Sequence, residues 1–192
     1  FGPRVVPDNY KVKLIVGEQE FVRELEVLKD PSTEGTIEEL KEQIAFSLEL
    51  RDAMNLAVTM INDLETIRRE LNEIIPKLNG KSDIKKAEEL SLLAESIAGS
   101  LYDIHLTGAR EDAFRSPIKL YGRLSALASD ISGFGADFKP TDQQREVYAI
   151  FNKQLKDVDL KFKKFLEVEV KKLNTQLKKS ELQIQSGIKL KS

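Results

Sequence analysis

The sequence predicts a mainly α-helical protein, an up-down bundle of two long and two shorter helices that follows a small N-terminal β-hairpin. Apolar residues recur at helical spacing over residues 46–78 and again over 148–177, and two capping boxes mark helix starts. Residues 10–16 and 21–28 instead show the period-two alternation of strands. With 192 residues, 41% of them hydrophobic, the chain is long enough to bury a sizeable core.

Residues 7–31 are typical of two antiparallel strands joined at a glycine-containing turn, and Pro31 stops the second strand. A two-stranded hairpin is marginally stable alone. We therefore expect it to pack on the lower half of the long helices or to belong to a larger sheet. The apolar residues of the first strand are the candidate interface at this junction: Tyr10, Val12, Leu14 and Val16.

The first long helix is predicted to begin near Ile37, because Thr36 and Glu39 form a capping box. Its apolar face is wide enough to contact several partner helices, unlike the narrow seam of a two-stranded coiled coil. Pro76 should loosen the last turn before Asn79-Gly80 ends the helix.

The second helix is predicted to be capped by Ser82 or Asp83 and to run to about Leu106. The third helix should start at the Ser116-Pro117 pair and run to about Ile131.

The fourth helix should open at a second capping box, Thr141 with Gln144. Its apolar stripe continues to Leu177 with the slow drift expected of a 3.6-residue period. Residues 182–190 alternate again and form either a short strand or a docked coil. These patterns divide the chain into a hairpin, 1–31, and a bundle, 32–192.

Two arrangements of these helices fit their lengths. In one, the second and third helices run end to end as the broken middle helix of a three-helix bundle. In the other, they form a hairpin beside an antiparallel pair of long helices. Charge favours the latter, since residues 34–75 hold ten acids and four bases, while residues 150–192 hold eleven lysines and five acids. This pairing places four lysines near four glutamates: Lys171, Lys172, Lys178 and Lys179 near Glu34, Glu38, Glu39 and Glu42.

The sequence offers no catalytic residue, no cofactor motif and no metal site. Cysteine is absent, so thiol chemistry is excluded, and His105 is the only histidine. Asp103, Glu111 and Asp112 lie near it, but a polar histidine at a helix end explains the pattern better than a metal ligand. The Glu-x-x-His motif of di-iron bundles, the Walker-type loop and the nucleophile elbow do not occur.

Two charged segments could suggest binding partners. Lys161, Lys163 and Lys164 flank phenylalanines that fall on the apolar stripe, so core packing is favoured over nucleic-acid binding. The connection over residues 107–116 carries Arg110 and Arg115, which form a charged clasp between helices or contact a partner, and we favour the clasp. No apolar run is long enough to span a membrane.

The order of segments resembles a known family. The Pro-x-x-Tyr-x-Val-x-Leu pattern at residues 7–14 is similar to the last strands of bacterial immunoglobulin-like or fibronectin-like modules. Together with Asp30-Pro31, "RSPIKLYGRLSALA" and "KPTDQQREVYAIF", it resembles the C-terminal region of large bacterial sortilin-like proteins, the BNR (Asp-box) repeat β-propellers often labelled glycosyl hydrolases. This chain has no Asp-box, and Ser32 follows where a basic residue is expected, so no catalytic residue is carried over.

The resemblance implies a secreted protein, periplasmic or extracellular, in which the propeller holds any ligand site. We therefore expect a non-catalytic structural and interaction domain whose partner is an upstream β module of the same protein. A homodimer through the hairpin edge is a second expectation, and a carbohydrate- or polymer-binding accessory module is the alternative function. The start at Phe1, without a methionine, is interpreted as a cut or processed end.

Overall fold

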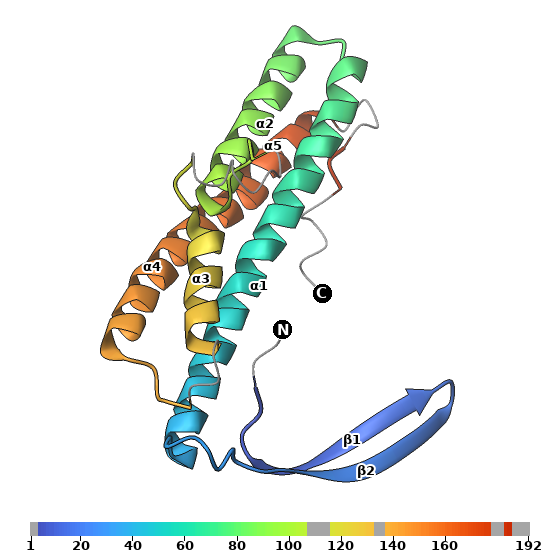
Figure 1. Cartoon of the computed structure of the whole chain (residues 1–192). Coiled ribbons are helices and arrows are strands. Elements are labelled where there is room, and N and C mark those ends of the chain that lie inside the picture. The colour runs from blue at the N-terminus through green and yellow to red at the C-terminus, as the bar shows by residue number, and fades with distance from the viewer. Residues whose placement is uncertain (1–3, 107–115, 133–136, 178–182, 186–192) are drawn as a thin grey trace.

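The computed structural model describes residues 4–106, 116–132, 137–177 and 183–185. It confirms a mainly helical chain with two long helical segments, two shorter helices and an N-terminal hairpin (Figure 1). The strands and helices, in chain order, are β1 (Asp8–Val16), β2 (Gln19–Val27), α1 (Ile37–Ile74), α2 (Lys81–Leu101), α3 (Leu120–Ser132), α4 (Asp142–Lys164) and α5 (Lys171–Leu177).

The bundle follows an up, down, up course (Figure 1). Helix α2 returns along α1, and α3 continues in the same direction, because Gln43 near the start of α1 donates to the carbonyl of Ile131 near the end of α3, at 3.0 Å. Helix α4 then runs parallel to α1, since Arg145 in its first turns pairs with Glu42 at 2.9 Å. The broken middle helix of a three-helix bundle, the first of the two arrangements left open by the sequence, is therefore the one adopted.

The antiparallel pairing of the long helices that charge favoured is wrong. Lys171 and Lys172 lie at the opposite end of the bundle from Glu42, and Lys178 and Lys179 lie outside the described residues. The reason is one of magnitude. Exposed ion pairs contribute about 0–1 kcal/mol each, so burial of the apolar faces decides the course of the helices.

Both predicted capping boxes are confirmed. The Thr36 hydroxyl accepts the backbone N–H of Glu39, whose carboxylate accepts the N–H of Thr36 in return. Thr141 and Gln144 repeat the arrangement at the start of α4. Pro76 lies in a 3₁₀ turn, Ile75–Lys77, which loosens the end of α1 as expected.

The predicted boundaries of the two middle helices are wrong by a few residues. Gly80, with extended backbone, is the N-cap of α2, and Asp83 lies within the first turn instead of capping it. Helix α2 ends at Leu101, not Leu106. Helix α3 begins at Leu120, because the Ser116 side chain hydrogen-bonds the Asp103 carboxylate and is not used as a cap.

One continuous core joins all five helices. A π-helical segment, Phe165–Val170, connects α4 to α5. An α-helix would place residues five apart about 140° from each other, yet Phe165 and Val170 are both buried. The π segment, with its i→i+5 bonding, keeps the apolar stripe of the fourth predicted helix facing the core. The sequence had instead predicted that this stripe drifts gradually around a regular α-helix. Phe162 is buried too, in agreement with its predicted core role.

The described part of the C-terminal tail, residues 183–185, is a docked coil and not a strand. Ile184 is fully buried, and the Asn174 side chain holds its backbone by accepting its N–H and donating to its carbonyl, both at 2.8 Å. The remaining residues of the predicted strand lie outside the described residues.

Replacing Asn174 with alanine is expected to lower the free energy of unfolding by about 1–3 kcal/mol, because two buried backbone groups lose their partners. Urea denaturation measures this. Thr175→Ala is the matched control, since Thr175 is exposed and bonds only within its helix. Equal losses in the two variants would contradict the proposed clamp.

Asp63 on α1 predicts an unusual dependence of stability on pH. Burial raises the pKa of its carboxyl, and its Oδ2 has no hydrogen-bond partner in the described part of the chain. The carboxyl ionises near pH 4 in the unfolded chain but only at a higher pH in the folded one. The free energy of unfolding therefore falls as the pH rises from the unfolded-state pKa through the folded-state pKa. Asp63→Asn should therefore raise Tm at pH 7, with a gain that fades below about pH 4. A lower Tm, or a gain independent of pH, would contradict this.

Candidate functional site

The register of the hairpin places its large apolar side chains on one face, with the exception of Ile15 and Val22. The two strands meet at a two-residue turn in which Gly17 has a φ of 61°, a left-handed conformation that favours glycine. Residues directly opposite one another share a face. The resulting apolar face consists of Tyr10, Val12, Leu14, Val16, Phe21, Leu25 and Val27, and it also holds three polar residues, Asp8, Gln19 and Arg23.

This apolar face is uncovered in the described structure. Leu14 is 59% exposed and Phe21 48%. Neither strand contacts a helix, and Figure 1 shows the hairpin projecting away from the bundle. In the described structure the hairpin therefore does not pack on the lower half of the long helices, which was one of the two expectations for it.

The opposite face of the hairpin carries most of its charge, together with the exposed side chains of Ile15 and Val22. Lys11 lies across from Glu24, and Lys13 pairs with Glu20 at 2.6 Å. Basic residues lie on β1 and acidic residues on β2, so cross-strand attraction supports the register. The hairpin is therefore amphipathic, with one face suited to water and the other to a partner.

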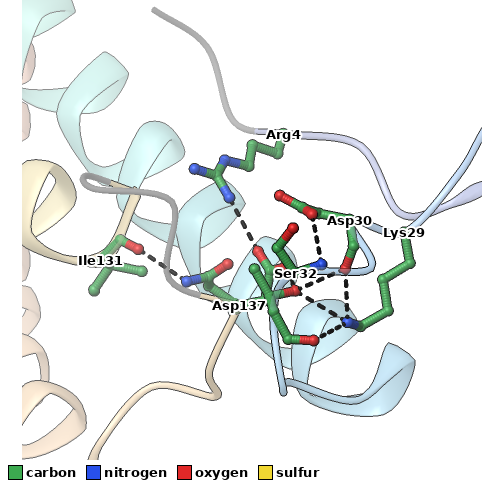
Figure 2. A network of polar contacts seen from close by, with 8 residues as sticks. Arg4, Lys29, Asp30, Ser32, Ile131 and Asp137 are labelled. Carbon is green, nitrogen blue, oxygen red and sulfur yellow. Dashed lines mark hydrogen bonds and ion pairs between the residues drawn. The ribbon is translucent and has the colours of Figure 1, made fainter.

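Both ends of the hairpin are tied to one buried carboxylate of the bundle. Asp137, which follows the connection from α3, is 5% exposed. It accepts from Arg4 before β1, at 3.1 Å, and from the Thr33 hydroxyl after β2, at 2.5 Å. Figure 2 shows Arg4 reaching Asp137 from the opposite side to Lys29 and Asp30. The anchor fixes where the hairpin leaves the bundle.

Further hydrogen bonds stiffen the segment after β2. The ammonium of Lys29 donates to the carbonyl of Thr33 at 2.6 Å and to its hydroxyl at 3.0 Å. The Asp30 carboxylate accepts the N–H of Ser32 at 2.8 Å, and this bond lowers the pKa of Asp30. The polar groups here are engaged with one another, which suits a structural anchor.

A second polar cluster clasps α1 to α2. The Tyr102 hydroxyl donates to Glu65, and Arg68 bridges Glu65 at 2.9 Å and Glu95 at 3.1 Å. Burial, followed by the bond to Glu65, raises the pKa of Tyr102 to about 12. The phenol therefore stays protonated at neutral pH and acts as a hydrogen-bond donor.

The other candidate residues from the sequence are only partly placed. Arg110 and Arg115 lie outside the described residues, as do Glu111 and Asp112. The backbone N–H of exposed His105 donates to Asp103, and this bond lowers the pKa of Asp103. Within the described ranges, no group of three His, Cys, Asp or Glu residues is placed to hold a metal ion.

The described aromatic rings form no binding platform. Among them only Phe21, on the hairpin, and Phe138, beside the anchor, are exposed. Among the described helices, none combines the length and apolar character needed to cross a bilayer.

The sequence analysis predicted two alternating strands but named only residues of the first as an interface, and it did not name Asp137. Phe21 and Leu25 join the face through the register, and the Gly17-Glu18 turn was the signal that could have set it. Asp137 had no such signal, because its partners are more than 100 residues away in the chain.

Comparison of the chain with protein-family models, with curated proteins and with solved structures found no match. The candidate site is therefore defined by its geometry alone.

Proposed function

We propose that this chain is a non-catalytic interaction domain in which the bundle is the scaffold and the hairpin is the docking element. One observation carries the proposal: the apolar face is exposed although both ends of the hairpin are fixed on the bundle by Asp137. An apolar face presented in this way, on an element held at its base, favours contact with a partner.

The partner in this proposal is a β module that precedes the hairpin in the same polypeptide. Two features support it. Each strand has nine residues, so the face is about 30 Å long, and its alternating side chains suit packing against another sheet. The resemblance to exported bacterial β-propeller proteins supplies the setting, a secreted protein in which the upstream domain carries the ligand site.

The use of the polar groups supports a non-catalytic role. Asp137 and Thr33 hold the hairpin, while Glu65, Arg68 and Tyr102 hold α1 to α2. In these two clusters, the groups that could act as acids or bases are engaged in joining elements of the fold. A site for chemistry needs polar groups that converge on a cavity.

Site-specific photo-crosslinking tests the proposal. A benzoyl-phenylalanine is placed at Leu14, on the apolar face, in the polypeptide encoded by the complete natural gene, and at Lys13, on the charged face, as the matched control. The expected result is a crosslink from position 14 to a β-sheet segment upstream of Phe1, with little product from position 13. Equal yields at both positions, or a crosslink from position 14 to the bundle, would overturn the proposal.

A further inference from the structure

The apolar face of the hairpin contains one basic residue near its middle. Arg23 lies directly opposite Val12, between the Tyr10–Leu25 and Leu14–Phe21 pairs. Its guanidinium donates to the neighbouring carbonyl of Val22 at 3.0 Å, and no carboxylate in the described part of the chain pairs with it. A fixed positive charge therefore lies at the centre of a mainly apolar surface, whose two end rows also hold Asp8 and Gln19.

We infer that the occupant of this face is an apolar sheet surface that carries a carboxylate opposite Arg23, and not a second copy of the chain. The inference rests on the proposed function and specifies the chemistry of the partner. A guanidinium buried in an interface needs a carboxylate to replace its lost hydration, and the planar fork of arginine suits that group.

A second copy carries one carboxylate on this face, Asp8 in an end row, but full overlap of the two faces does not bring it opposite Arg23. Arg23 occupies the middle one of the five paired rows of the apolar face. When two such faces stack with full overlap about a two-fold axis, the axis brings Arg23 close to its own symmetry mate whether it runs along the strands or across them. Two like charges would then be desolvated together.

Pairing through the hairpin edges is also opposed by charge. Joining β1 to a second β1 sets Lys11 and Lys13 against the same two lysines, and joining β2 to a second β2 sets Glu20, Glu24 and Glu26 against one another. Like charges directly opposite each other destabilise a sheet. The homodimer through the hairpin edge is therefore not the assembly that we propose.

Sedimentation equilibrium of the chain alone, over a concentration series, tests the part of the inference that concerns self-association. We expect a monomer for the unchanged chain and for Arg23→Lys, but a dimer for Arg23→Leu, which removes the charge from the middle of the face. Adding Leu14→Lys to Arg23→Leu should restore the monomer. A dimer of the unchanged chain that Leu14→Lys abolishes would overturn the inference, as would a monomeric Arg23→Leu variant.

The carboxylate itself is tested by crosslinking from position 14 in the complete polypeptide. Arg23→Glu should lower the yield roughly tenfold, while Arg23→Lys should keep most of it. A yield unchanged by Arg23→Glu would overturn the inference and leave the proposed function standing. Absence of the crosslink even with Arg23 present would overturn the proposed function.

Discussion

Replacing Leu64 with alanine is expected to lower the free energy of unfolding by about 3–5 kcal/mol. Leu64 is fully buried in α1, within the core that the helices share. The substitution removes apolar contacts and leaves a cavity that tightly packed neighbours cannot fill. Urea denaturation followed by circular dichroism at 222 nm, a wavelength dominated by helices, measures the loss.

The matched control for this variant is Leu14→Ala on the hairpin. Leu14 is 59% exposed, and its strand contacts no helix in the described structure. We expect a change within about 0.5 kcal/mol, as for an ordinary surface site. A loss at Leu14 comparable to that at Leu64 would contradict the separation of stability, which lies in the bundle, from the docking surface.

The second large effect is expected at Gly35, in the connection between β2 and α1. A Cβ at this position would lie 1.8 Å from the carbonyl oxygen of Asp137 and 2.7 Å from its carbonyl carbon. These are backbone atoms, so the clash cannot be relieved by a rotamer change. Gly35→Ala should force the two connections apart, weaken the Thr33–Asp137 bond and lower the free energy of unfolding by about 2–3 kcal/mol.

Gly99→Ala is the control for the Gly35 variant. Gly99 lies inside α2, and nothing lies within 4 Å of the position that its Cβ would take. Alanine is the better helix former, so we expect a gain of about 0.5–1 kcal/mol. Thermal melts of the two variants should therefore shift in opposite directions. A lower Tm for Gly99→Ala, or an unchanged Tm for Gly35→Ala, would contradict the close approach of Gly35 to the Asp137 carbonyl.

The features predicted correctly from sequence depend on residues close together in the chain. The boxes at Thr36 and Thr141 each join residues three apart, and the alternation around Gly17 is local as well. Local hydrogen bonds of this kind are encoded within a single turn. For the same reason the apolar residues of β1 could be assigned to one face before their surroundings were known.

The features that were missed depend on packing between distant segments. The parallel course of α1 and α4, the π segment before α5 and the anchor at Asp137 follow from how whole helices meet. Ser116 illustrates the limit: it is a good helix cap by local rules, but its hydroxyl bonds Asp103 instead. Exposure of the hairpin could not be predicted either, since an amphipathic strand has the same pattern whether it is covered or open.

The central claim, that the apolar face of the hairpin is open to solvent in this chain, is tested most directly by thiol labelling. The chain has no cysteine, so a single introduced thiol reports on its own position only. The rate of reaction with an aromatic disulfide reagent is measured for Leu14→Cys on the apolar face and for Lys13→Cys on the charged face. Ala57→Cys, at a fully buried position in α1, is the protected reference.

If the face is open, the thiols at positions 14 and 13 should react at similar rates, close to that of an unfolded peptide, while the thiol at position 57 reacts only as the bundle unfolds. A thiol at position 14 that is protected as strongly as the one at position 57 would mean that the face is covered within this chain. That result would contradict the assignment of the hairpin as a docking element.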